Sequence, residues 1–459
     1  MENKMSFKRK LILALPQPAS VLGQIFIHNT LMKYYTDIIG IDPRYIGWIY
    51  LIYNIWNAIN DPLFGIWIDR MKYNPKRGKY VYLMRVTAPV MMLSVLGMIV
   101  SSPSWNEWVI FFALLAELFF FDTAYTIFSV AYQSYFLLAA PTAQERVEID
   151  VVRIYIGNAV GFLATLIPTF LLVGDTKDKP IIPAFIGVVI VSSVLLFVAV
   201  KCLKDKPDLY RGLQDNQVKL TPKEAWKEAW EILKAKPFLT YLLFYITARG
   251  AMEYYFNPFL YFMDHVIKAD GTVATLADVI PGLVMLLLLP FIAKAVKKLG
   301  ARKVIILSYI PALLGFGGLL VINRAWQSVI CYMFIVLSLN SVQNAGVVVS
   351  GALIDENEQR TGVRKTGLVG GLFSLIATTL TSVQAVVFTN VIAHFGYEAG
   401  AAVQTERAVM GIRVGAGLVP IIFALVGLIP ILIFPFNKKR EDELSEFSKE
   451  AREKEKIDA

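Results

Sequence analysis

Polar side chains recur at helical spacing inside a stretch that is otherwise apolar. Asn54, Asn57 and Asp61 are separated by three and four residues, and Asn60 stands beside Asp61. Residues at this spacing share one face of a helix. A carboxylate beside side-chain amide oxygens offers the oxygen ligands that a small hard cation prefers. The same carboxylate could instead carry a proton, and in either form an ion gradient could drive work through it.

Three further apolar stretches carry polar residues at comparable spacing. Ionisable groups within membrane spans are costly and usually mark function. For serine and threonine by themselves, hydrogen bonding between helices is the favoured interpretation. The sets are Asp122, Thr126, Ser129 and Gln133; Gln17, Gln24 and His28; and Ser374, Thr378 and Ser382.

The chain lacks the residue patterns of an enzyme. Its histidines are isolated and its cysteines, Cys202 and Cys331, form no CxxC pair. No Walker loop, GxSxG or HExxH motif is present. We therefore expect no catalytic residues and no cofactor, and no metal beyond an alkali cation at Asp61.

The elements that position these residues must be membrane helices. Of 459 residues, 56% are hydrophobic and 18% are charged, against about 45–50% and about 25% in soluble domains. A helix needs about 20 apolar residues to cross the hydrocarbon core. Twelve stretches qualify: 11–31, 46–68, 81–100, 109–138, 154–173, 181–200, 238–266, 276–293, 304–321, 329–353, 368–395 and 410–434.

Basic residues predict the orientation. With the N-terminus inside, the inner segments carry 34 Lys and Arg residues and the outer loops carry 6. This asymmetry follows the positive-inside rule, so both termini are expected in the cytoplasm and the protein in an inner (plasma) membrane. It also accounts for the net charge of +9, so no nucleic-acid partner is expected.

The chain reads as two halves. We predict a six-helix bundle over 1–203, a cytoplasmic linker with an amphipathic helix over 204–236, a second six-helix bundle over 237–436, and a charged, helical cytoplasmic tail over 437–459. The loops after the second helix of each half look related, with Gly78 and Gly300 beside basic residues. Alternatively, these loops are two short cytoplasmic turns whose basic residues only reflect the orientation of the chain in the membrane. Six plus six helices is the pseudo-two-fold architecture of major-facilitator transporters, an all-α membrane fold.

Several motifs resemble a known family in matching order along the chain. The segment from Trp56 to Gly65, with Asp61-Pro62 in it, resembles the second-helix signature of the glycoside–pentoside–hexuronide:cation symporter family. Tyr34-Tyr-Thr-Asp37 is similar to the family's first-helix end, and Lys234-Ala-Lys-Pro237 to its entrance to the seventh helix. We expect loop residues to act in gating: Asp69, Arg70, Arg77 and Lys79 in the repeated loop, and Glu145, Arg146, Asp355 and Arg364 in loops that match the family.

The resemblance implies a cation site. The family uses two second-helix carboxylates one turn apart and a fourth-helix threonine. Asp61 matches the second carboxylate, Asn57 replaces the first, and Thr126 matches the threonine, with Asn60 adjacent. The coupling cation is Na⁺ or H⁺; losing one carboxylate favours protons, unless Asp122 compensates.

The resemblance also implies a substrate site that departs from the family. Arg153 is kept, whereas Val21 and Ser129 fall where a galactoside-carrying member has sugar-binding aspartates. Arg153 could equally pair with Asp150 or Glu148. The expected lining is Arg153, Ser129, Tyr132, Gln133, Gln24, His28, Val21, Tyr125 and Thr378. It is polar and poor in carboxylates, which favours an uncharged or anionic solute.

The sequence therefore predicts a secondary active transporter. It would carry a glycoside, uronide or related sugar-like solute together with Na⁺ or H⁺ by alternating access. The alternatives are a cation-coupled lysolipid transporter of the same fold and a non-transporting membrane sensor. The expected partners are a small-molecule solute and the lipid bilayer, and the expected oligomeric state is a monomer.

Overall fold

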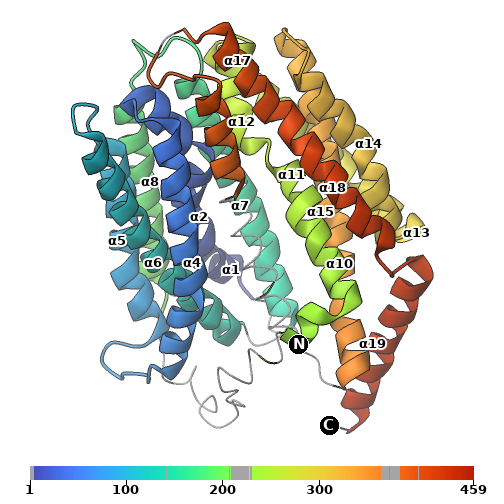
Figure 1. Cartoon of the computed structure of the whole chain (residues 1–459). Helices are drawn as coiled ribbons and strands as arrows, with labels where there is room; N and C mark the ends of the chain where they lie inside the picture. The colour runs from blue at the N-terminus through green and yellow to red at the C-terminus, as the bar shows by residue number, and fades with distance from the viewer. Residues whose placement is uncertain are drawn as a thin grey trace. The chain divides into compact units, whose positions relative to one another are not determined.

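The computed structural model describes residues 5–140, 143–205, 230–362, 383–401 and 403–458, with Pro207, Lys227 and Leu372 as single residues. Within these residues the chain is helical, and the one isolated β-bridge joins Asn74 and Gly78. The chain divides into two compact units, Met1–Val218 with Glu398–Ala402 and Lys219–Tyr397 with Val403–Ala459. Figure 1 shows the helices of each unit.

The first unit consists of long helices after an interrupted start. Proline has no backbone N–H and disfavours a continuing helix, so Pro16 begins a new helix after Leu15 in place of the single helix expected over 11–31. The elements are α1 (Phe7–Ala14), α2 (Pro16–Asn29), α3 (Leu31–Lys33), the π-helix η1 (Tyr34–Ile39), α4 (Pro43–Arg70), α5 (Tyr80–Val100), α6 (Glu107–Ala139), α7 (Ala143–Leu172) and α8 (Ile181–Cys202).

The second unit has its interruptions at the expected seventh and twelfth helices, where π-helical turns alternate with α-helix. Its elements are α10 (Lys236–Phe244), η3 (Tyr245–Arg249), α11 (Gly250–Glu253), α12 (Phe256–Tyr261), η4 (Phe262–Val266), α13 (Gly271–Leu299), α14 (Ala301–Leu319), α15 (Ala325–Thr361), α17 (Glu406–Arg413), η5 (Val414–Leu418), α18 (Val419–Ile433) and α19 (Lys438–Asp458). A further apolar helix covers Val383–His394. The expected helical tail is present as α19.

Nine helices in the described residues are long and apolar enough to cross a membrane. Three of the twelve expected spans are not among them. The helix α4 is long enough, but Asn54, Asn57, Asn60 and Asp61 lower its hydropathy. The span over 238–266 is divided into short segments. Half of 368–395 lies outside the described residues, as does most of the linker over 204–236 with Trp226. Twelve spans and cytoplasmic termini stay predictions.

The same pairs of helices pack together in both units. In the first unit α5 and α4 both pack on α6, and α8 packs on α5 and α2. In the second unit α14 and α13 both pack on α15, and α18 packs on α14 and η3. Counted from the start of each unit, these are the same helix pairs. The packing therefore has the internal repeat that the related loops indicated.

A glycine with positive φ stands before the third long helix of each unit. Gly78 has φ of +77° and Gly300 has φ of +86°, a region that other residues rarely adopt. The carboxylate of Asp205 accepts hydrogen bonds from the backbone N–H groups of Lys79 and Val81, at 2.8 and 3.1 Å. Both carboxylate oxygens of Glu441 lie 3.1 Å from the backbone N of Ala301. A carboxylate that follows α8 thus caps the start of α5 in the first unit, and a carboxylate in the first turn of α19 caps the start of α14 in the second.

Candidate cation and substrate site

The helices α4 and α6 pack against each other and bring two polar stripes together. On α4 the stripe consists of Asn57, Asn60 and Asp61; on α6 it consists of Asp122 and Thr126. The spacing of three or four residues keeps each stripe on one side of its helix. The cluster therefore forms from two helices that are far apart in sequence.

Asp122 lies at the centre of the cluster and is fully buried. Its Oδ1 accepts hydrogen bonds from Asn57 Nδ2 at 2.7 Å and from the Tyr53 hydroxyl at 3.3 Å. The amide of Asn60 donates to the second oxygen. All three donors are neutral, so these bonds satisfy oxygen atoms of Asp122 without supplying a positive charge.

Thr126 connects the buried carboxylate to Asp61. Its Oγ1 lies 2.7 Å from Asp61 Oδ1 and 3.2 Å from Asn60 Oδ1. A threonine hydroxyl has one hydrogen and can donate to only one of these oxygens at a time. One acceptor oxygen in the cluster is therefore left without that donor, and it could bind a cation or a proton.

Around the cluster, neighbouring side chains of α4 make hydrogen bonds and a ring contact, whereas Asp61 is exposed. Asn54 is buried; its Nδ2 donates to the Tyr50 carbonyl at 2.7 Å, and its Oδ1 has no hydrogen-bond partner. Trp56 donates to Thr123 Oγ1 at 3.2 Å and stacks on Phe119. Asp61 itself is exposed, so an ion could reach its carboxylate.

Arg153 on α7 pairs with Asp150, one of the two partners that the sequence left open. Its Nη2 lies 2.6 Å from Asp150 Oδ1, while Glu148 pairs with Lys10 at 2.7 Å. The guanidinium lies over the Phe136 ring, 5.5 Å from the centroid. Its Nη1 is buried and has no hydrogen-bond partner among the residues that the structure describes, so one donor group is still available.

The other expected lining residues are less uniform. Tyr132 is buried, and its hydroxyl donates to the Leu13 carbonyl at 2.8 Å, which joins α6 to α1. Gln24 and His28 pair on α2 at 3.2 Å. In the described part of the chain, no hydrogen bond joins this pair to α6. Ser129, Tyr125 and Val21 are half-buried, Gln133 is exposed, and Thr378 lies outside the described residues.

The loop residues expected to act in gating have diverse surroundings. Arg77 lies over the Tyr82 ring and Lys79 over the Tyr80 ring. Arg146 Nε donates to the Ala140 carbonyl at 2.8 Å. Glu145 and Asp355 are half-buried. The side chains of Asp69 and Arg70, and the whole of Arg364, lie outside what the structure describes.

Asp122 is the residue that sequence reasoning undervalued. From the sequence, Asp122 was expected only as one of four polar residues at helical spacing, and as a residue that could compensate for the carboxylate that Asn57 replaces. The signal was present, since Asp122 is one turn before Thr126. Its three donors, however, all come from α4, and the sequence alone does not give the register between two helices.

This all-helical fold, with its repeated packing and its polar cluster inside apolar helices, defines a major-facilitator transporter, a multi-pass integral protein of the plasma membrane and not an enzyme. A family model described as MFS/sugar transport protein matches residues 12–438. The chain belongs to this family, in the glycoside–pentoside–hexuronide:cation symporter branch.

Relatives and a solved structure agree with this assignment. The chain is 24% identical over 454 residues to the "uncharacterized symporter YnaJ" of Bacillus subtilis, covering 95% of this chain and 93% of the relative. It is 25% identical to the "glucuronide carrier protein homolog" of Escherichia coli, with 93% and 91% covered. A crystal structure of the nucleoside transporter NupG superposes with a TM-score of 0.64 at 13% identity, covering 93% and 98%. This last likeness concerns the fold alone.

Proposed function

We propose that this transporter carries a sugar-like organic solute in symport with one monovalent cation bound between α4 and α6. The observation that supports the proposal best is the hydrogen-bonded series Asp61–Thr126–Asn60–Asp122. It joins an exposed carboxylate to a buried one through groups that can rearrange when an ion binds.

The proposed cation ligands are Asp61 Oδ1, Asn60 Oδ1 and Thr126 Oγ1. These oxygens lie close together because Thr126 is within 3.2 Å of both others. Together they carry one negative charge, which matches one Na⁺ ion or one proton. Membrane interiors penalise an uncompensated charge, so a bound cation would favour a different arrangement of α4 and α6 from an empty site.

Asp122 takes a second role in the proposal. It occupies the side of the cluster that faces Asn57, where the family resemblance implies a carboxylate. Because three neutral donors already bind its oxygens, we assign it to hold Asn57 and Asn60 in place. Its charge would add to the attraction that the site exerts on a cation.

The proposed solute is an uncharged or anionic sugar derivative, with a hexuronide as the first choice. Among the described residues, the buried Nη1 of Arg153 has no hydrogen-bond partner, and a hydrogen bond from a guanidinium to a carboxylate is stronger than one between neutral groups. The name of the Escherichia coli relative, a glucuronide carrier homolog, agrees with this choice.

The decisive experiment compares wild type with Asp61→Asn in proteoliposomes. We expect the variant to lose at least tenfold in gradient-driven accumulation while it retains part of its solute exchange, which needs no net ion movement. Asp178→Asn serves as the matched control, because Asp178 is an exposed loop residue. A sodium gradient at equal pH and a pH gradient without sodium identify the ion. Undiminished accumulation by Asp61→Asn would refute the coupling role.

The solute class is tested by thermal unfolding of the purified protein in nanodiscs. Neutral glycosides, hexuronides, sulfonated sugars and lysolipids are each added with sodium and with potassium. A ligand that binds the folded state raises the melting temperature. A rise with hexuronides that disappears in Arg153→Gln supports the proposal, whereas a rise with lysolipids alone contradicts the sugar assignment.

A further inference from the structure

A cleft of about 600 Å³ lies between α5 and α8 on the first unit. Beside it the two helices expose large apolar side chains, among them Leu93 on α5 and Phe197 and Val194 on α8. An apolar surface of this kind on membrane-spanning helices faces lipid. The cleft is therefore open to lipid molecules.

One end of the cleft is basic. Arg85 near the start of α5 and Lys201 near the end of α8 both line it. Arg85 Nη2 is 3.4 Å from the Leu203 carbonyl, and Lys201 Nζ lies over the Phe197 ring. Among the residues that the structure describes, the lining contains no acidic side chain. The nearby Asp205 already binds the backbone N–H groups of Lys79 and Val81.

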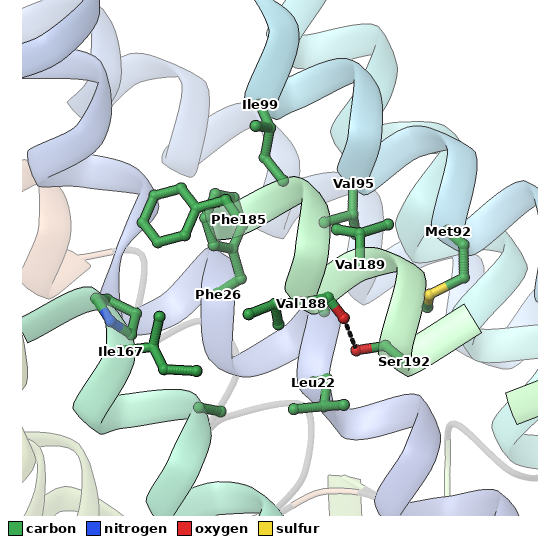
Figure 2. A pocket seen from close by; sticks show the side chains of 13 residues that line it. Leu22, Phe26, Met92, Val95, Ile99, Ile167, Phe185, Val188, Val189 and Ser192 are labelled. Carbon is green, nitrogen blue, oxygen red and sulfur yellow. Dashed lines mark hydrogen bonds between the residues drawn. The ribbon is translucent and has the colours of Figure 1, made fainter. Parts of the chain in front are cut away.

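Apart from Ser193, the rest of the cleft lining is apolar, and one of its residues also lines a second cavity inside the unit. Met92 lines both this cleft and a small cavity of about 30 Å³ between α2, α5, α7 and α8. Figure 2 shows Met92 and Val95 on α5 opposite Val188 and Val189 on α8. The Ser193 hydroxyl, which lines the cleft, donates to the Val189 carbonyl at 2.7 Å. The Ser192 hydroxyl in the small cavity donates to the Val188 carbonyl at 2.6 Å. Met92 is two helical turns beyond Arg85, about 10 Å at 1.5 Å per residue.

We propose that this cleft binds an anionic glycerophospholipid, with its phosphate between Arg85 and Lys201 and an acyl chain along Met92. Charge complementarity selects this occupant, since two cations without an acidic neighbour in the lining attract a phosphate diester. The distance from the basic end to Met92 fits within one leaflet, whose hydrocarbon is about 15 Å thick. The basic end lies at the side predicted to be cytoplasmic, where anionic lipids attract basic residues.

Native mass spectrometry of the full chain tests the proposal. The protein is titrated with phosphatidylglycerol and, separately, with phosphatidylcholine of the same acyl chains. We expect a phosphatidylglycerol adduct that Arg85→Gln with Lys201→Gln weakens about thirtyfold. The matched control, Lys72→Gln with Lys76→Gln, removes two exposed charges outside the cleft and should bind as wild type. Arg85→Lys with Lys201→Arg keeps the charges and should also bind.

A second variant tests the acyl-chain part of the cleft. Leu93→Trp adds bulk at the exposed edge of the cleft without changing charge, and we expect it to weaken the adduct at least tenfold. Unchanged binding by Leu93→Trp, equal binding of phosphatidylcholine, or equal loss in the control pair would overturn the proposal. Displacement by glycerol phosphate would show a phosphate site instead. A dimer that dissociates in the Arg85 and Lys201 variant would show that a second copy covers the cleft, which also overturns it.

Discussion

At the scale of single residues, Asp122 is a fully buried carboxylate that accepts three side-chain hydrogen bonds. A buried carboxylate is tolerated when its oxygens are hydrogen-bonded, and three donors from α4 provide this. Removing one member of such a network leaves the others unsatisfied. Asp122 therefore determines the arrangement of Asn57 and Asn60, and through Thr126 it affects Asp61.

Asp122→Asn tests this dependence. The substituted amide replaces an acceptor oxygen with a donor that faces Asn57 or Asn60, so at least one buried donor loses its partner. We expect a cost of about 1–3 kcal/mol, a melting temperature lower by a few degrees, and strongly reduced accumulation. Thermal unfolding and proteoliposome uptake measure the two effects against Asp178→Asn. A variant with unchanged melting temperature and uptake would show that Asp122 has no such role.

Asn57→Asp tests the cation site from the opposite direction. The new carboxylate would lie where Asn57 now donates to Asp122 at 2.7 Å, so two acids would repel each other. A bound cation relieves that repulsion. We therefore expect a lower melting temperature in potassium and a larger rise on adding sodium than in wild type. An equal sodium effect in both proteins would place the cation elsewhere.

The sequence predicted the polar residues of the site better than their partners. Helical periodicity was enough to put Asn57, Asn60 and Asp61 on one face, because spacing within one helix is fixed. It was not enough to show that Asp122 receives their hydrogen bonds, because that depends on how α4 and α6 pack. Tyr132, which the family resemblance implied as a lining residue, is buried, and its hydroxyl donates to the Leu13 carbonyl; this bond too depends on how two helices pack.

At the scale of elements, the turn before α5 depends on one glycine. Gly78 has positive φ, its N–H donates to the Asn74 carbonyl at 2.7 Å, and a Cβ at this position would overlap the Asp205 side chain. The turn, the cap of α5 and the end of α8 are therefore packed around a residue without a side chain. Loops of this kind leave a signal in sequence only as a glycine among basic residues.

Gly78→Ala should be destabilising for both reasons. A left-handed conformation costs a residue with a Cβ about 1–2 kcal/mol, and the displacement of Asp205 weakens the cap of α5. We expect the melting temperature to fall by several degrees. Gly187→Ala is the matched control, since it lies within α8 and a Cβ there meets nothing within 4 Å. Equal melting temperatures for the two variants would contradict this account.

The positions of most helices were predictable and their interruptions were not. The expected span over 181–200 is α8 (Ile181–Cys202), and the one over 81–100 is α5 (Tyr80–Val100), because long apolar runs have few alternatives in a bilayer. The break at Leu15 and the segments between Lys236 and Val266 depend on proline positions and on π-helical turns. A hydropathy profile does not reveal π-helical turns or a break at a proline within an apolar stretch.

At the scale of the whole molecule, the repeated helix pairs agree with a duplicated six-helix plan. The sequence predicts twelve spans, and an even number places both termini on one side of the membrane. The described residues include nine helices that could span a membrane, so the total of twelve spans stays a prediction. The 34 basic residues assigned to inner segments favour the cytoplasm for that side.

Reporter fusions test the orientation. A phosphatase that is active only outside the cytoplasm should be active after Asp178 or Asp270 and inactive after Asp205 or Asp458. A fluorescent protein that folds only inside should give the reverse pattern. Agreement at Asp205 but not at Asp458 would mean an odd number of spans in the second half and would contradict the duplicated plan.

The two carboxylate caps, Asp205 and Glu441, also determine where this chain can be divided. Asp205 follows α8 and caps the start of α5, whereas Glu441 lies in the first turn of α19 and caps the start of α14. Each carboxylate therefore works as a clasp that closes a bundle. Separate expression of the halves would therefore need a cut beyond Asp205, since an earlier cut opens the first clasp. For the same reason, a truncation before Glu441 would remove part of the second bundle's closure, whereas a purification tag after Asp458 would leave both clasps closed.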